Sequence, residues 1–308
     1  MGCFTDPPKP APTFTPVTVS TTPPPKTEST FVIDQIEFVR LPMQTILLGS
    51  ATGELGRSTN EHLIQYAQKT PIAISRCEIT EQQYWAIKDP THVVPDATKN
   101  HPVTNVTWDE AQEFCELLSS RHSMGTGRLP RESEWEYACR AGNTEMFSFW
   151  NPTLQEAFVR LRDYKDTKQL PRKLKKLMRF SSESIGDVGS FEKNEFGLLD
   201  MHGNAYEWCD VAEDSMAAWN DSTSLADRPI RGGGWLSNYV DCRSARRAWQ
   251  PRTDKSKSIG FRVLIELTGT TSVASAVGQP DQSLAVSDTT SDVRLPAPVS
   301  SEDWSRSR

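Results

Sequence analysis

The sequence predicts an α+β domain with little regular secondary structure, and it places a polar tail on each side of that domain. Two capping-box motifs indicate helix starts, and the apolar runs that are typical of strands are short. Eight of the nine tryptophans fall between residues 31 and 267, where much of the sequence has no clear periodicity. Such a composition is typical of a domain held by aromatic clusters beneath long loops.

The two ends of the chain differ in composition from its centre. Residues 1–30 hold eight prolines and eight threonines, and residues 268–308 hold nine serines and one aromatic residue, Trp304. Such segments bury too little apolar surface to offset the entropy of ordering. We therefore expect a disordered Pro/Thr-rich tether at 1–30, one domain at 31–267 and a disordered Ser/Thr-rich tail at 268–308.

The charge balance excludes some classes of partner. The 308 residues hold 34 Lys and Arg against 40 Asp and Glu, a net charge of −6, which is unfavourable for binding nucleic acid. The longest apolar runs are far below the ~20 residues of a transmembrane helix. The sequence contains no CxxC pair and no HxxxH pair, so it gives no sign of a zinc site or of a metal site built from histidines. A protein or peptide partner of unknown identity is the expectation that remains.

The first residues leave two locations open. No apolar stretch precedes Cys3, so the sequence as given carries no signal peptide and predicts a cytoplasmic protein. The alternative is a periplasmic or extracytoplasmic lipoprotein, because Gly2-Cys3 followed by a Pro/Thr-rich tether is how a bacterial lipoprotein begins after its lipobox. In that case the start codon is mis-called and Cys3 carries the lipid.

Three helices are predicted inside the domain. Thr80 and Gln83 form a capping box that opens a helix through Lys88. Thr107 and Glu110 form a second capping box. The residues after it place an apolar face at i, i+3, i+4 and i+7: Ala111, Phe114, Cys115 and Leu118.

The third helix begins after Pro130 with acidic residues that suit a helix N-terminus, and Gly142 is its expected C-cap. Strands are predicted at Phe31–Val39, Ile72–Ile74 and Phe261–Ile265. Several tryptophans and cysteines are expected to be buried core residues: Trp135, Trp208, Trp235, Cys115, Cys139 and Cys209.

Residues 160–179 form a basic stretch, with nine basic and two acidic side chains. Leu170, Leu174 and Leu177 recur in it at helical spacing, so it can be a basic helix that binds a partner. The alternative is a solvated insertion whose charges only keep it in water.

A possible metal site lies between residues 196 and 210. Asp200 and Glu207 are seven residues apart, with Gly203 between them. Calcium needs six to eight oxygen ligands, which carboxylates and the carbonyls of a tight turn can supply. The pattern is compatible with a calcium site, and acid-Gly-acid loops are also common in solvated loops.

A glycine-rich turn follows at residues 231–237. Three consecutive glycines allow the backbone to fold back closely, and Trp235 can fill the turn. Arg243, Arg246 and Arg247 come shortly after it, and they could line an anion-binding surface.

Seven ordered blocks of sequence resemble the formylglycine-generating enzyme family, also called sulfatase-modifying factors. The resemblance covers nearly all of residues 36–267, and it implies a C-type-lectin-related α+β fold. The blocks are LLGS at 47–50, CEIT at 77–80, HPVTNVTWDEAQEFC at 101–115, RLPRESEWEYACRAG at 128–142, FGLLDMHGNAYEWCD at 196–210, IRGGGWLSNYVDCRSARR at 230–247 and IGFRV at 259–263.

The resemblance implies a copper-dependent oxidation that this sequence supports only in part. Active members convert a cysteine of a sulfatase peptide to Cα-formylglycine, using O2 and copper held by two cysteines five residues apart. The second cysteine matches Cys242, whereas the first falls on Ser237. A hydroxyl is a poor ligand for Cu(I), so the sequence predicts a protein that lacks this oxidation. Cys209 is the one substitute with any sequence rationale.

The family's calcium motif is better preserved. It implies a side-chain oxygen at Asp200, carbonyls at Gly203 and Ala205, and a carboxylate at Glu207. The sequence therefore predicts a calcium-binding family member that acts as a binding or accessory module. The alternative is an active formylglycine-generating oxidase with a remodelled copper site around Cys242.

Overall fold

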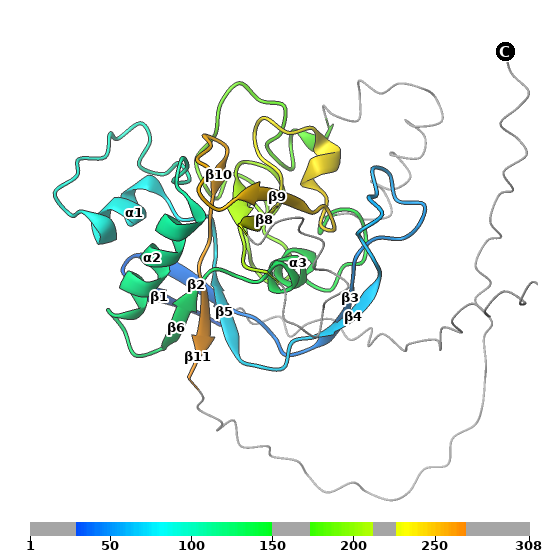
Figure 1. The fold of residues 1–308 in the computed structure, drawn as a ribbon, viewed down its shortest axis with the longest axis horizontal. Coiled ribbons are helices and arrows are strands. Elements are labelled where there is room, and N and C mark those ends of the chain that lie inside the picture. Colours follow the sequence, from blue (N-terminus) through cyan, green and yellow to red (C-terminus); the bar gives the residue numbers. More distant parts are fainter. Residues whose placement is uncertain (1–28, 150–172, 212–225, 269–308) are drawn as a thin grey trace, which may run out of the picture. The chain divides into compact units, whose positions relative to one another are not determined.

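A computed structural model describes residues 29–149, 173–211 and 226–268, all within a contact unit that ends at Gly269 (Figure 1). The tether and the tail predicted from composition lie almost entirely outside these ranges, as does Cys3. Most of the basic stretch, residues 160–172, also lies outside them. Within the described residues, no helix is long and apolar enough to span a membrane.

The largest sheet has five antiparallel strands in the order β1-β2-β5-β11-β6. Its order differs from chain order because the last strand inserts between the fifth and the sixth. The first and last parts of the described domain therefore pair directly with its middle. The strands are β1 (Thr30–Ile33), β2 (Ile36–Arg40), β5 (Ile72–Ser75), β6 (Gly125–Arg128) and β11 (Leu264–Leu267).

Alternate residues of this sheet enter two separate cores. Phe38, Ala73 and Ile265 pack with α1 (Glu81–Lys88) and α2 (Trp108–Ser119), whereas Ile74 and Leu264 pack with α3 (Glu132–Arg140). The period of two in a strand explains this division. In Figure 1, α1 and α2 lie on one side of the sheet and α3 on the other.

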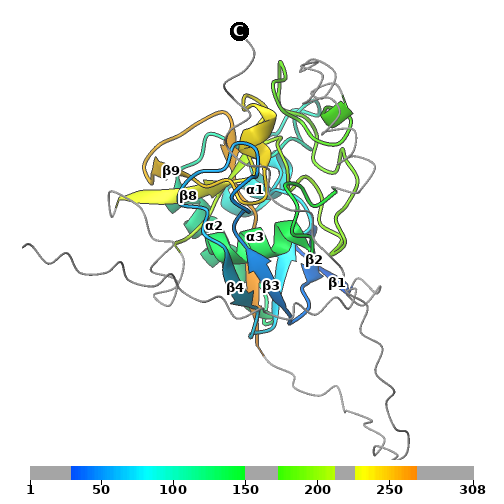
Figure 2. The ribbon, with the colours of Figure 1, turned by 90° about the vertical axis from the view of Figure 1, so that its right-hand side faces the viewer.

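Two smaller sheets complete the domain. A four-stranded sheet has the order β10-β7-β8-β9, and its β10–β7 pair is parallel. A hairpin of β3 and β4 packs beside α3 (Figure 2). The elements are β3 (Thr45–Leu48), β4 (Ile64–Ala67), β7 (Tyr206–Trp208), β8 (Asp227–Arg231), β9 (Ala248–Pro251), β10 (Ile259–Gly260) and the 3-10 turn η2 (Tyr239–Cys242).

Local motifs predicted the helices well. Both capping boxes are present, with Thr80 and Thr107 as N-caps, and the four predicted apolar residues of α2 are buried. The six tryptophans and cysteines expected in the core are also buried. The C-cap of α3 was predicted wrongly: Ala141 takes the left-handed conformation at this position, with φ +48°, and Gly142 follows it.

Two predicted strands have different limits. The run at residues 31–39 is a hairpin instead of one strand, because Asp34 and Gln35 both have positive φ and turn the chain between β1 and β2. Such a turn matches the twist of the flanking strands. The run at residues 261–265 enters its strand only at Leu264. The apolar pattern was correct in both places, and the turn chemistry was not recognised.

Candidate functional site

Cys242, the predicted copper ligand, is a packed core residue. It lies at the end of η2 and is fully buried in a cluster with Phe147, Met178 and Phe180. Burial and the neighbouring Asp241 carboxylate raise the pKa of its thiol far above the ordinary value. The thiol form of Cys242 is therefore strongly favoured over the thiolate that copper needs.

Ser237, at the other copper position, is part of the turn itself. Its Oγ accepts a hydrogen bond from the Gly234 N–H at 3.0 Å, and its carbonyl accepts one from the Ser181 N–H at 2.8 Å. The turn also depends on Gly233, which has φ +74°. A Cβ there would lie 2.6 Å from the Cys242 sulfur. The serine hydroxyl thus closes a turn that packs directly on the thiol.

Among the described residues, Cys242 is a free thiol with no disulfide to a second cysteine. Cys209 belongs to the core around Trp135, which is a different cluster from that of Cys242. A titratable side chain that was not predicted from the sequence, His202, contacts the backbone of Cys242. His202 lies 2.8 Å through Nδ1 from the Cys242 carbonyl oxygen, and its Nε2 accepts from the Ser148 N–H at 3.0 Å. Burial lowers the pKa of His202 to about 4, so its ring is neutral.

The predicted calcium loop forms an irregular turn at the start of β7. Asp200, Gly203 and Asn204 have positive φ values of +56°, +87° and +62°. A Cβ on Gly203 would lie 2.1 Å from the Arg179 carbonyl oxygen, so this position requires glycine. The turn is pinned to the glycine-rich segment, because the Gly203 N–H donates to the Gly232 carbonyl at 2.8 Å.

Asp200 has one carboxylate oxygen without a partner. Its Oδ2 accepts a hydrogen bond from the Gly189 N–H, whereas its buried Oδ1 accepts none. Burial raises the pKa of Asp200 to about 6, and the negative charge of Glu207 adds to the increase. Burying a carboxylate oxygen without a hydrogen-bond partner costs free energy. Such an oxygen is the type of donor that calcium prefers.

Glu207, the second predicted carboxylate ligand, is already paired. Arg262 donates to its Oε2 from Nε at 2.6 Å and to its Oε1 from Nη2 at 2.7 Å. The Trp135 Nε1–H donates to the same Oε2 at 2.6 Å. All three side chains are fully buried. Glu207 is thus held in a bidentate ion pair, and it can ligate an ion only through its remaining lone pairs.

A third buried carboxylate, Glu78, was not predicted from the sequence. Its Oε1 accepts from the Asn204 side-chain amide at 3.1 Å, whereas its Oε2 has no hydrogen-bond partner. Burial raises its pKa well above the usual range, with further contributions from Asp200 and Glu207. The available signal was an acidic residue three positions after the apolar strand β5. Arg262 thus lies near all three buried carboxylates but hydrogen-bonds to Glu207, and Arg179 is a second cation near Asp200.

These residues satisfy the calcium motif in part. Among the described residues, no group of three or more His, Cys, Asp and Glu side chains is arranged to hold a metal ion. The predicted set needs only two carboxylates, because its other donors are the carbonyls of Gly203 and Ala205. The unpartnered Asp200 Oδ1 fits an ion, and the pairing of Glu207 with Arg262 opposes it. Calcium binding at this turn stays a prediction.

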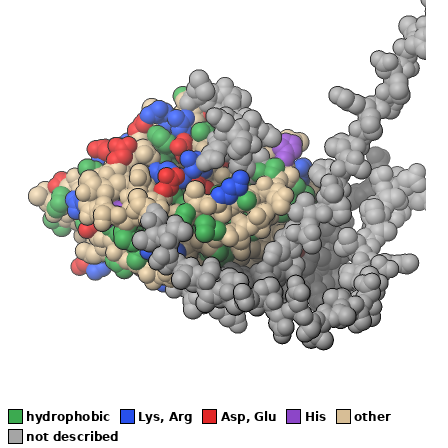
Figure 3. All heavy atoms as spheres, turned by 90° about the horizontal axis from the view of Figure 1, so that it is seen from below, with side chains coloured by type: hydrophobic (Ala, Val, Ile, Leu, Met, Phe, Trp, Pro, Cys, Tyr) green, Lys and Arg blue, Asp and Glu red, His purple; other side chains and the backbone are tan. Residues whose placement is uncertain are grey.

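Arg243, Arg246 and Arg247 do not form the expected anion-binding surface, so that prediction was wrong. Arg243 donates to both oxygens of Glu61, Arg247 donates to both oxygens of Glu132, and Arg246 pairs with Asp241. Arg243 and Arg247 are buried, so they join distant loops instead of meeting a ligand. On the face drawn in Figure 3, acidic and basic side chains are likewise interspersed.

Comparison with known proteins identifies the family. Residues 52–267 match the family model FGE-sulfatase, described as a sulfatase-modifying factor enzyme 1-like domain. The chain belongs to this family. The family resemblance of the ordered sequence blocks is thereby confirmed.

Three relatives show how far the similarity extends. The formylglycine-generating enzyme of Mus musculus is 28% identical over 172 residues, covering 53% of this chain and 44% of that protein. The inactive C-alpha-formylglycine-generating enzyme 2 of Bos taurus is 29% identical over 167 residues, covering 52% and 49%. The structure of PvdO from Pseudomonas aeruginosa has a TM-score of 0.63 at 25% identity, covering 79% of this chain and 100% of that one.

The match thus spans about half the length of these two curated relatives, and it covers the whole of the PvdO chain. The expected fold, an α+β domain of the formylglycine-generating enzyme type with few helices, is confirmed by the likeness to PvdO.

Proposed function

We propose that this protein is a binding or accessory module of the sulfatase-modifying factor family, and that it does not convert cysteine to formylglycine. The observation that carries the proposal is the replacement of one copper-ligand thiol by the Ser237 hydroxyl, which accepts from the Gly234 N–H within the turn. The remaining thiol, Cys242, is buried among apolar side chains. A bovine relative is named an inactive enzyme, which supports the proposal that a member of this family can lack the activity.

The chemistry of copper supports the same conclusion. Cu(I) favours soft thiolate ligands, and a single thiolate leaves the ion without its second soft donor. Burial disfavours the thiolate of Cys242, and its sulfur packs so close to the turn that a Cβ on Gly233 would lie 2.6 Å from it. Oxidation of a substrate cysteine would therefore need a copper site remodelled from other residues.

The experiment is a direct search for the aldehyde product. The purified protein is incubated with copper, O2 and a peptide that carries the Cys-x-Pro-x-Arg motif of sulfatases, and the peptide is then analysed by mass spectrometry. We expect the cysteine to remain unmodified. Formation of the aldehyde would establish the alternative function, an active oxidase with a remodelled site.

We also propose that the Gly203–Asn204 turn binds calcium through Asp200 and the carbonyls of Gly203 and Ala205, with Glu207 held beside them by Arg262. The unpartnered Asp200 Oδ1 supports this proposal. Calcium at about 100 times its Kd adds about 2.7 kcal/mol to stability, which raises the Tm of a domain of this size by roughly 5–10 °C. Thermal unfolding with added calcium and with a chelator measures the difference, and equal Tm values would contradict calcium binding.

A further inference from the structure

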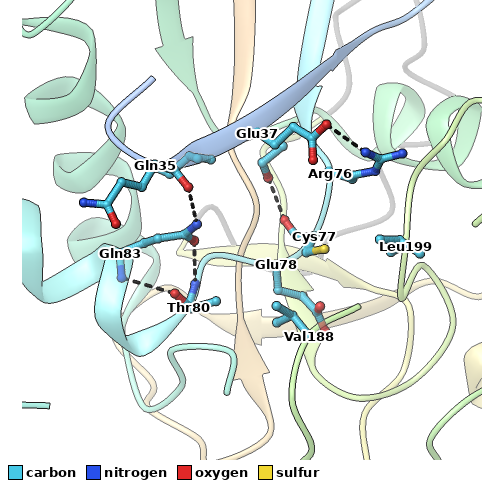
Figure 4. Close-up of a pocket in the computed structure, with 11 residues that line it drawn as sticks. Gln35, Glu37, Arg76, Cys77, Glu78, Thr80, Gln83, Val188 and Leu199 are labelled. Carbon is cyan, nitrogen blue, oxygen red and sulfur yellow. Dashed lines mark hydrogen bonds and ion pairs between the residues drawn. The ribbon is translucent and has the colours of Figure 1, made fainter. Parts of the chain in front are cut away.

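A pocket of about 350 Å³ lies between the β1–β2 turn, the segment after β5 and the loops around residues 188 and 199 (Figure 4). Its volume is at the lower end of the range for ligand sites, and it suits one small group or one side chain. In Figure 4, Gln35, Thr80 and Gln83 lie on one side and Leu199 on the other, with Cys77, Glu78 and Val188 between them.

The pocket combines apolar walls with one uncompensated carboxylate. Ile36, Val188 and Leu199 are the aliphatic residues that line it. Glu78 lines the same pocket, is only 1% exposed, and keeps its Oε2 without a hydrogen-bond partner. An unpaired buried acceptor of this kind costs free energy, and a cationic donor would remove that cost.

The cationic side chains near Glu78 are committed elsewhere. Arg76 lines the pocket, yet its Nη1 donates to Glu37 at 2.7 Å and its Nε to the Gly197 carbonyl at 3.0 Å. Arg262 forms the bidentate pair with Glu207. Burial and the neighbouring Asp200 and Glu207 carboxylates raise the pKa of Glu78, whereas the charge of Arg262 opposes the increase.

We propose that this pocket binds a primary ammonium on an aliphatic stem, and that its natural occupant is a lysine side chain of a partner protein. The stem packs against Ile36, Val188 and Leu199, and the ammonium donates to the Glu78 Oε2. An organic cation fits better than a metal ion, because the cavity is much larger than a coordination shell with oxygens at 2.3–2.6 Å. In addition, no group of three or more acidic, histidine or cysteine side chains among the described residues is arranged to hold a metal ion.

This inference deepens the proposed binding function, because it names the chemistry of the partner. It depends on that proposal only for the existence of a partner. The aldehyde assay does not report on the pocket, and a lysine-binding assay does not report on oxidation. The failure of either proposal is therefore visible by itself.

The first test uses two matched probes and the wild-type protein. N-acetyl-lysine methylamide carries the stem and the ammonium, whereas N-acetyl-norleucine methylamide carries the stem alone. In an NMR shift titration, the lysine probe is expected to saturate in the millimolar range that is typical of small fragments, and the norleucine probe to bind at least about tenfold more weakly. Equal binding of the two probes, or no binding of the lysine probe, overturns the proposal.

The second test uses a variant of the carboxylate. Glu78→Gln keeps the size of the side chain and an oxygen that can accept from Asn204, so the fold is expected to persist. It should weaken the lysine probe by about tenfold or more and leave the norleucine probe unchanged. Glu113→Gln, on the surface of α2 and outside the pocket, is the matched control and should bind like the wild type. Unchanged lysine binding in Glu78→Gln overturns the proposal.

The third test separates the lysine pocket from a metal site. The titrations are repeated with a chelator and with saturating calcium. Independent binding of calcium and the lysine probe supports the assignment of Glu78 to the ammonium. Competitive displacement of the probe by calcium, together with loss of the calcium response in Glu78→Gln, would assign Glu78 to the ion and overturn the proposal.

Discussion

The segment from Gly232 to Cys242 and the turn around Gly203 and Asn204 are joined by main-chain hydrogen bonds, yet their polar atoms have opposite environments. In the first region, the Ser237 hydroxyl has a donor and the Cys242 sulfur is packed in an apolar cluster. In the second, Asp200 and Glu78 each bury a carboxylate oxygen without a partner. The first region is complete without a ligand, and the second is not.

This difference is the reason that we expect binding in the second region. A region whose polar groups have partners within the fold needs no ligand to complete it. Unpartnered buried oxygens, by contrast, cost of the order of 1–3 kcal/mol each, and they are retained where they have a role. Binding at the Asp200–Glu78 side is therefore the expectation, and oxidation at the Cys242 side is not.

The largest expected effect comes from breaking the ion pair that organises the second region. Arg262→Met leaves Glu207 buried and unpaired, so it should lower the free energy of unfolding by about 3–5 kcal/mol, measured by chemical denaturation. Arg252→Met removes an exposed pair with Asp109 and should change the free energy of unfolding far less. Similar losses in the two variants would contradict the assignment of Arg262 to the scaffold.

The pH dependence of stability tests the contact between the two regions. Unfolded histidine titrates near pH 6.5, whereas burial lowers the pKa of His202 to about 4. Below pH 6.5 the unfolded chain binds a proton that the folded protein excludes. Stability should therefore fall between about pH 6.5 and 4, by on the order of 3 kcal/mol from this residue.

His202→Gln should remove that part of the slope, measured by denaturation at several pH values against the wild type. Replacement of the exposed His92 by Gln is the control and should leave the slope unchanged. A slope retained in His202→Gln would show that the ring is not the group that titrates.

A smaller effect of opposite sign is expected at Asp200. Its folded pKa of about 6 lies above the ordinary value of 3.8, so ionisation destabilises the fold as the pH rises through this range. Asp200→Asn removes the charge and tolerates the positive φ. It should raise stability at pH 7 without calcium by roughly 1–3 kcal/mol and abolish the stabilisation by calcium. A full calcium response in this variant would exclude Asp200 as a ligand.

The smallest expected change in stability is at Ser237. Ser237→Cys replaces a good acceptor of the Gly234 N–H with a weak one, which should cost about 0.5–1.5 kcal/mol. The same variant restores the second thiol and should compete better than the wild type for Cu(I) against a chromophoric chelator. Unchanged copper affinity would mean that the packing around Cys242, and not the missing thiol alone, prevents metal binding.

Local signals determined which features could be predicted from the sequence. The capping boxes at Thr80 and Thr107 act within four residues, and both helices were predicted correctly. The hairpin turn at Asp34 and Gln35 was missed, because neither residue is the glycine that usually marks positive φ. The α3 cap was missed for the same reason. Ala141 takes a left-handed conformation that normally favours glycine, so the cap was predicted at Gly142 instead.

Contacts between residues far apart in the chain could not be predicted from the sequence. Glu78 acquires its role from Asn204, which is 126 residues away, and Glu207 is neutralised by Arg262, which is 55 residues away. The motif identified Asp200 and Glu207 as a pair of ligands. It could not distinguish the carboxylate with an unpartnered oxygen from the one already held by a guanidinium. Only the fold reveals that difference.

The His202 ring has a consequence for communication within the domain. It belongs to the loop that begins at Asp200, and its Nδ1 contacts the carbonyl of Cys242. A rearrangement of the loop would therefore be transmitted to the backbone at the thiol. Coupling between two sites is reciprocal, so a substitution that moves the backbone at Cys242 would in turn shift the loop at His202.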